Sequence, residues 1–121
     1  MRFIDSHTHL ADPTFADDLD AVIARARDAG AVALVAIGES LAAAERARGI
    51  AERYPDFIFH TAGVHPYDAA AFDSRRDIPA LRAEVEQGAV AIGECGLDYS
   101  YDTATPLQQR RAFAEIGRAH V

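Results

Sequence analysis

Residues 31–37 read AVALVAI, a near-continuous apolar run that directly follows Gly30. Apolar residues on both sides of the chain predict a strand covered on both faces, as in parallel sheets. The stretch before this run carries apolar residues at helical spacing from Phe15 to Ala26, and Gly30 is placed to end that helix. A helix that leads into a buried strand is the unit of an α/β fold.

The same alternation extends in both directions along the chain. Further strands are predicted at residues 3–7, 57–63 and 89–93. Residues with side chains that cap helices precede the amphipathic stretches. We therefore expect helices to begin at the caps Thr14, Ser40, Asp77 and Thr105.

The order of elements predicts a fold of the α/β class with parallel strands and right-handed crossovers. The strands end near residues 7, 37, 63 and 93, so they are spaced by 30, 26 and 30 residues. A TIM-type (β/α) barrel of about 250 residues has about 31 residues per unit. The chain therefore fits a partial barrel with about four of eight βα units. A doubly wound open sheet has the same periodicity and remains the alternative.

Composition narrows the class of protein. A length of 121 residues allows one domain, and the 50% hydrophobic content excludes a fully disordered chain. No apolar run reaches the about 18 residues of a membrane span. The single Cys95 forms no internal disulfide, so we expect a cytoplasmic protein. The net charge of −7 argues against nucleic-acid binding through a positive surface, although bound cations reverse the sign of a site locally.

In both candidate folds, ligands bind beyond the carboxyl ends of the strands, here near residues 7, 38, 64 and 94. His7 and His9 end the first strand and point to the same face, as two ligands of one metal would. Asp5 shares that face and is placed to accept a hydrogen bond from a ligating imidazole. A pair of solvated loop histidines is the alternative interpretation.

Polar residues also follow the third and fourth strands. Glu94 comes directly after a buried strand, beside glycine, where its carboxylate is suited to bridge two cations; an exposed loop acid is the alternative. His65 is held extended by Pro66 and either contacts substrate or is a structural loop residue. Asp98 either orients the Glu94 loop or meets substrate.

Other polar residues are interpreted as structural. His60 lies inside the third strand and is expected to be a satisfied core residue. Cys95 has no evident base partner and is expected to be a buried small hydrophobe rather than a nucleophile. Arg75 and Arg76 are expected to be paired surface charges.

Three motifs together resemble the TatD family of metal-dependent hydrolases: IDSHTHL at residues 4–10, GVHPY at 63–67 and AIGECGLDY at 91–99. The resemblance runs from residue 2 to about residue 114. It implies a distorted TIM barrel that binds two divalent cations (Mg, Mn or Zn) and cleaves phosphodiesters, commonly in DNA.

By this resemblance, His7 and His9 ligate the first metal and Glu94 bridges both. Glu94 and His65 are then catalytic residues, and His65 and Asp98 contact the substrate, with Asp5 behind the metal ligands. The implied mechanism is attack on phosphorus by a metal-activated water.

The chain departs from the family in length, because family members are about twice as long and take further ligands from strands five, six and eight. We therefore expect a truncated chain with little activity alone. Residues 1–115 would form the N-terminal half of the barrel, and residues 116–121 would leave the family pattern, with Gly117 breaking the fourth helix. Two alternatives are a non-catalytic half-barrel that associates through open sheet edges and a related amidohydrolase acting on C–N bonds; the GECGLDY segment counts against the second.

Overall fold

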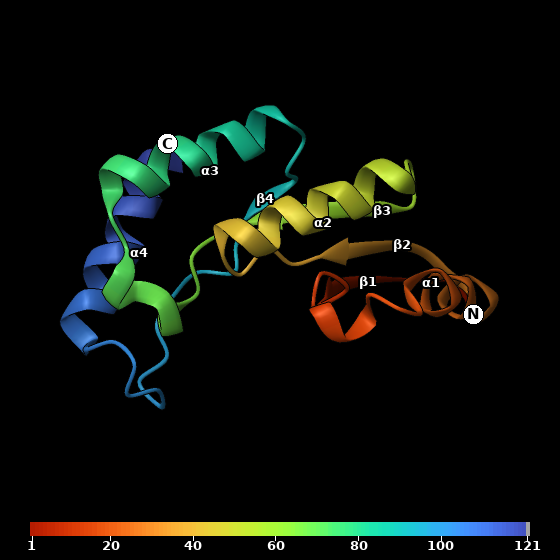
Figure 1. Cartoon of the computed structure of the whole chain (residues 1–121), viewed down its shortest axis with the longest axis horizontal. Coiled ribbons are helices and arrows are strands. Elements are labelled where there is room, and N and C mark those ends of the chain that lie inside the picture. The colour runs from red at the N-terminus through yellow and green to blue at the C-terminus, as the bar shows by residue number, and fades with distance from the viewer. Residues whose placement is uncertain (121) are drawn as a thin grey trace.

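The computed structural model describes residues 1–120, which form a parallel sheet with helices after each strand (Figure 1). The strands run in the order β1-β2-β3-β4, and each is parallel to its neighbours. Their bounds are β1 Phe3–Thr8, β2 Ala31–Ala36, β3 Ile58–Ala62 and β4 Ala91–Ile92. The α-helices are α1 Leu19–Asp28, α2 Leu41–Arg53, α3 Ser74–Glu86 and α4 Pro106–His120, with short 3-10 helices η1 Pro13–Phe15 and η2 Pro66–Ala71. The predicted α/β class is confirmed.

The helices cover one face of the sheet. In β3, Ile58 and His60 are 2% and 3% exposed, whereas Phe59 between them is 38% exposed. Successive strand residues point to opposite faces, so one face lies beneath helices and the other does not. A doubly wound sheet carries helices on both faces. The one-sided cover is that of a barrel wall, with Phe59 on the inner surface.

Two apolar clusters hold the helices on this outer face. The first joins α1 and α2 to β2 and β3, and the second joins α2, α3 and α4 near the end of β3. The first contains Leu10, Ala11, Leu19, Ile23, Ala31, Leu34, Ala36, Ala47, Ile50, Phe57 and Ile58, and the second Ala44, Ala62, Val64, Leu81 and Ile116.

Two of the predicted helix caps are confirmed. Ser40 caps α2 by accepting a hydrogen bond from the backbone N–H of Ala43 at 3.2 Å. Thr105 and Gln108 form a reciprocal capping box at the start of α4, with Pro106 in the first position. At both positions the residue with the capping oxygen directly precedes a stretch with apolar residues at helical spacing.

The other two caps are wrong by a few residues. Thr14 lies inside η1 and donates its hydroxyl to Asp12, and α1 begins only at Leu19. The ring of Pro13 favours this tight turn, in which Asp12 is the cap. Asp73, rather than Asp77, caps α3, while the buried Asp77 accepts from the backbone N–H of Asp73 and from Arg76. The expected ion pairing is thus confirmed for Arg76, whereas Arg75 has no ion pair among the described residues.

The ends of the sheet and of the chain also differ from expectation. β4 has two residues rather than five, because only Ala91 and Ile92 pair with β3. The break expected at Gly117 is wrong, since α4 continues to His120. A glycine inside a helix costs about 1 kcal/mol relative to alanine, and burial of the adjacent Ile116, 3% exposed, offsets that cost.

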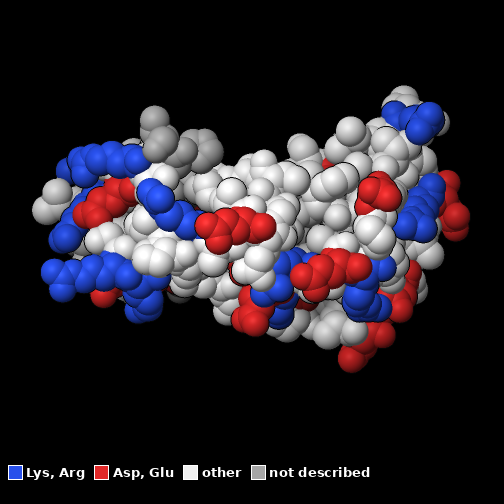
Figure 2. All heavy atoms as spheres, turned by 90° about the horizontal axis from the view of Figure 1, so that it is seen from above, with Lys and Arg blue, Asp and Glu red and all other residues white. Residues whose placement is uncertain are grey.

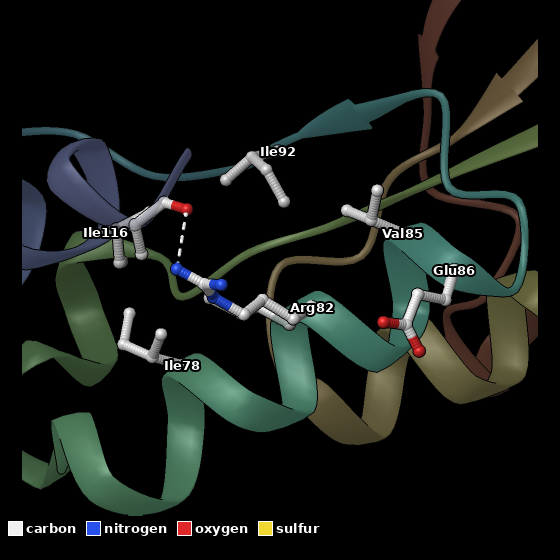
Figure 3. Close-up of a pocket in the computed structure, with 8 residues that line it drawn as sticks. Ile78, Arg82, Val85, Glu86, Ile92 and Ile116 are labelled. Carbon is white, nitrogen blue, oxygen red and sulfur yellow. Dashed lines mark hydrogen bonds between the residues drawn. The ribbon is translucent and has the colours of Figure 1, made fainter. Parts of the chain in front are cut away.

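An apolar groove of about 220 Å³ lies between α3, α4 and β4, away from the carboxyl ends of β1 and β2 (Figure 3). Arg82 reaches across it to donate a hydrogen bond to the carbonyl of Ala119 at 3.3 Å. Its lining is mainly aliphatic, and its polar residues are Arg82 and Glu86. Among the described lining residues Glu86 is the single carboxylate, so the groove does not bring together the several donors of a metal site.

Charged side chains are unevenly distributed. On the face shown in Figure 2, Arg residues predominate toward the left end, whereas Arg and acidic residues are mixed in the middle and toward the right end. The Arg residues are interrupted by acidic ones, so this face has no continuous basic surface for a phosphate backbone. Within residues 1–120, every helix is too short or too polar to cross a membrane.

Candidate metal centre

Three side chains with metal-binding atoms converge at the carboxyl ends of the strands. His7, His9 and Glu94 each offer one such atom, and the three atoms lie within 4.8 Å of one another. His7 Nε2 is 3.4 Å from Glu94 Oε2, and the two imidazole rings are 5.1 Å apart in an edge arrangement. The structure thus brings together the residues expected to be ligands, and their role as ligands stays a prediction.

The approach of His7 to Glu94 depends on the curvature of the sheet. His7 belongs to β1 and Glu94 follows β4, and these strands lie at opposite edges of the sheet. A flat sheet would separate the edges by three strand spacings of about 4.8 Å each. Their contact at 3.4 Å requires a sheet that curls as a barrel does.

Two residues of the β3 region hold the Glu94 segment against the sheet. The Thr61 hydroxyl donates to the carbonyl of Gly93 at 2.6 Å and accepts from the backbone N–H of Gly38 at 3.1 Å. A Cβ on Gly63 would lie 2.6 Å from the carbonyl oxygen of Glu94, so only glycine permits this approach. Sequence reasoning assigned no role to Thr61 or Gly63, because their contacts are to residues distant in the chain.

Glu39 is a member of this region that sequence reasoning missed. It follows β2, and its Oε2 lies 3.4 Å from Nδ1 of His9. Its carbonyl accepts from the backbone N–H of His65 at 2.8 Å, which ties the ends of β2 and β3 together. Its position in the sequence could have identified it, because Glu39 follows the carboxyl end of a buried strand, where ligand-binding residues were expected.

His65 lies on the other side of Glu94. Its Nδ1 accepts a hydrogen bond from the backbone N–H of Tyr67 at 3.0 Å. In the neutral ring the proton is therefore on Nε2, which is 3.7 Å from Glu94 Oε1. The two oxygens of Glu94 thus face different histidines, His7 and His65.

Asp98 orients the turn that follows Glu94. Its carboxylate accepts from the hydroxyl of Ser100 at 2.5 Å and from its backbone N–H at 2.9 Å. These bonds, with a smaller contribution from His65, hold the pKa of Asp98 below its ordinary value. The buried amide of Gln109 bonds both backbone groups of Asp98, and sequence reasoning missed that anchor. Contact of Asp98 with substrate stays a prediction.

Three further residues have local roles. Asp5 accepts from the backbone N–H of His7 at 3.2 Å, and its expected bond to an imidazole stays a prediction. Cys95 is only partly buried, although burial was expected; desolvation still raises the pKa of its thiol, which agrees with the expected inert side chain. His60 is a core residue as expected, but the expectation that it is satisfied is wrong. Its buried Nε2 lies 3.4 Å from Glu84 without a hydrogen-bond partner among the described residues.

The chemistry of the converging donors fits a divalent cation. Imidazole nitrogens and a carboxylate oxygen are ligands of Zn, Mn and Mg in different proportions. The two histidines are half exposed, so their side chains are accessible from solvent. The donor set can hold a cation and leave coordination positions open for water or substrate.

The family model and the curated relatives point to the same family. The family model described as TatD related DNase matches residues 4–119. A "3'-5' ssDNA/RNA exonuclease TatD" from Edwardsiella piscicida is 41% identical over 95% of this chain and 47% of its own length. A protein of the same name from Dickeya dadantii is 41% identical over 91% of this chain and 42% of its length. The chain thus spans less than half the length of these curated relatives.

Solved structures show the same fold. A TatD family hydrolase from Entamoeba histolytica matches with a TM-score of 0.88 and 25% identity over 99% of this chain and 46% of that one. A TatD homolog from Escherichia coli matches with a TM-score of 0.85 and 27% identity over 98% and 46%. In both cases the four βα units match slightly less than half of the solved chain, and the predicted half-barrel is confirmed.

Proposed function

Because the chain belongs to the TatD related DNase family, we propose that it supplies a divalent cation site of a metal-dependent phosphodiesterase. The observation that carries this proposal is the convergence of His7, His9 and Glu94, whose ligand atoms lie within 4.8 Å. The names of the relatives, exonucleases of single-stranded DNA and RNA, supply the substrate class. They favour phosphodiesters over the alternative of C–N bonds.

Each residue of the site has a distinct role in this proposal. His7, His9 and Glu94 would hold the cation, and the second oxygen of Glu94 lies toward His65. The Nε2 proton of His65 is then placed to bond a phosphate oxygen. When bound there, a divalent cation would make water available as a nucleophile near neutral pH, because it lowers the pKa of water from about 15.7 to about 7.

The complete reaction is proposed for a protein in which further ligands join these three, since the chain spans less than half of its relatives. Two cations, of Mg, Mn or Zn, are proposed for that protein, with Glu94 between them. Low activity of this chain alone and a cytoplasmic address stay predictions from the sequence.

Removal of the Glu94 carboxylate is expected to weaken cation binding. Glu94→Gln should lower the affinity for Mn²⁺ by more than the about 100-fold lost when an outer-shell partner is removed, because a direct ligand is lost. Titration calorimetry measures this. Glu86→Gln, the same change at an exposed position of α3, is the matched control and should bind as the unaltered chain does. Equal affinity in Glu94→Gln, or no binding by the unaltered chain, contradicts the proposal.

A second proposed property, association between copies, follows from the uncovered strands. Among the described residues, β1 pairs with β2 alone and β4 with β3 alone. Ile4 in β1 is 62% exposed, although strands of parallel sheets are normally covered on both faces. Unpaired edges with exposed apolar side chains favour pairing with another chain.

Light scattering is expected to give a mass above the 13.1 kDa of one chain. Ile4→Lys should shift the mass toward the monomer, because a charge on an exposed edge strand opposes pairing. Leu107→Lys changes an apolar residue on α4 that is 69% exposed, slightly more than Ile4, and should leave the mass unchanged. A monodisperse monomer at all concentrations contradicts association through the edges.

A further inference from the structure

A pocket of about 240 Å³ adjoins the metal centre. Two of its lining residues belong to the surroundings of that centre. His65 Nε2 is 3.7 Å from Glu94, and Glu39 Oε2 is 3.4 Å from His9. The complete lining is Glu39, Ser40, His65, Tyr67, Asp68 and Tyr101. A ligand could therefore place one part in this pocket and its neighbouring part beside His7, His9 and Glu94.

The pocket presents aromatic rings to solvent. Tyr67 and Tyr101 are 48% and 41% exposed, and their rings are perpendicular with centroids 5.2 Å apart. Tyr101 also meets the ring of His65 edge-on at 5.7 Å. The Thr103 hydroxyl donates to the carbonyl of Tyr67 at 2.7 Å, which fastens the segment after β4 to η2. The rings are thus held in place without being buried in the core.

The charges around the pocket select what can enter it. Glu39 and Asp68 contribute carboxylates to the lining, and no Arg lies among the lining residues. A phosphate would be repelled here, whereas a cation at the neighbouring centre would attract it. The pocket therefore suits the uncharged part of a nucleotide. Carboxylate oxygens accept hydrogen bonds, so they favour a base that carries an amino group.

We propose that Tyr67 and Tyr101 form a subsite for one unpaired nucleobase, which stacks on one of the two perpendicular rings and meets the other edge-on, while Glu39 and Asp68 accept from its exocyclic amino group. The proposal rests on the proposed function only for placing the adjacent phosphate at the metal centre. Base–aromatic stacking contributes about 1–3 kcal/mol per base. A base in a duplex is already stacked on both faces, so the subsite takes single strands. Adenine and cytosine are preferred to thymine and uracil, which lack the amino group.

The test uses short single-stranded oligonucleotides that carry 2-aminopurine, whose fluorescence is quenched on stacking. The full chain should quench it, and Tyr67→Ala/Tyr101→Ala should weaken binding by at least about fivefold, as loss of about 1 kcal/mol implies. Tyr101→Phe keeps the ring and should bind normally. Tyr99→Ala removes a tyrosine that is 54% exposed outside the pocket and is the matched control.

Base preference provides a second measurement. Unlabelled oligo-dA should compete better than oligo-dT of equal length, and Glu39→Gln/Asp68→Asn should reduce that difference. Unchanged quenching in the double tyrosine variant, or equal competition by the two oligonucleotides, overturns the subsite. Quenching in the presence of EDTA and calorimetry with Mn²⁺ separate the two proposals. Stacking without Mn²⁺ binding supports the subsite and contradicts the metal function, whereas Mn²⁺ binding by a chain that does not stack does the reverse.

Discussion

Replacing Gly63 with alanine is expected to destabilise the chain by roughly 3 kcal/mol, at the upper end of the usual cost of overpacking. A Cβ at this position would lie 2.6 Å from the carbonyl oxygen of Glu94 and 2.6 Å from the carbonyl carbon of Gly93. Both are backbone atoms, which cannot turn aside as the end of a long side chain can. Relief of the contact requires the Glu94 segment to move away from β3, so the affinity for Mn²⁺ should fall together with stability.

Urea unfolding followed by circular dichroism measures the first effect, and calorimetry with Mn²⁺ measures the second. Gly49→Ala is the matched control, because Gly49 lies inside α2 and a Cβ there meets nothing within 4 Å. It should raise stability by about 0.5–1 kcal/mol and leave Mn²⁺ binding unchanged. A Gly63→Ala chain with normal stability and normal affinity would show that the close approach of β3 and Glu94 is unimportant.

Acidification is expected to destabilise the fold through His60. This residue is 3% exposed, and its burial lowers the imidazole pKa below the ordinary value of 6.5. Glu84 is 3.4 Å away and Glu52 also favours the charged ring, but Arg48 bonds the same Glu84 oxygen at 3.2 Å and opposes it. The folded state therefore favours the neutral ring.

The sign of the pH dependence follows from this preference. In the unfolded chain His60 takes up a proton as the pH falls through about 6.5, whereas the folded chain does so only at lower pH. Unfolding is then accompanied by proton uptake, and stability falls below about pH 6.5 by up to about 1.4 kcal/mol per pH unit.

Urea midpoints measured between about pH 7 and 5 test this expectation. His60→Gln removes the titrating ring and should flatten the dependence. Glu84→Gln removes the carboxylate that favours the charged ring, so the loss of stability should persist or extend to lower pH. An identical pH profile for the unaltered chain and His60→Gln would assign the acid sensitivity to other groups.

Much of the fold was predictable because its signals are local. The apolar run of β2 and the caps Ser40 and Thr105 each occupy a few consecutive residues. The pairing of His7 with His9 also depends only on the alternation of a strand. Glu94 was predicted from its place directly after a buried strand, but its contact with His7 across the sheet requires the barrel curvature.

Some features could not be predicted because two nearby residues suit the same role, and others because they depend on residues distant in the chain. Asp73 and Asp77 are both suitable caps, and only packing of α3 decides that Asp77 is buried within the helix. Gly63 is special only because the Glu94 segment passes beside it. Gly117 breaks no helix because Ile116 is buried in the second apolar cluster.

Because β4 is short, the approach of Glu94 to His7 depends on the pairing of only two residues. β4 is joined to β3 by the pairs Thr61–Ala91 and Ala62–Ile92, so its release breaks few backbone hydrogen bonds. Short, marginally paired segments open at lower free energy than the core of a sheet. Local opening there would carry Glu94 away from His7 while the helices over β2 and β3 stay folded. A cation bound by both His7 and Glu94 would stabilise the form in which β4 is paired with β3. It would increase the population of that form by the free energy of its binding.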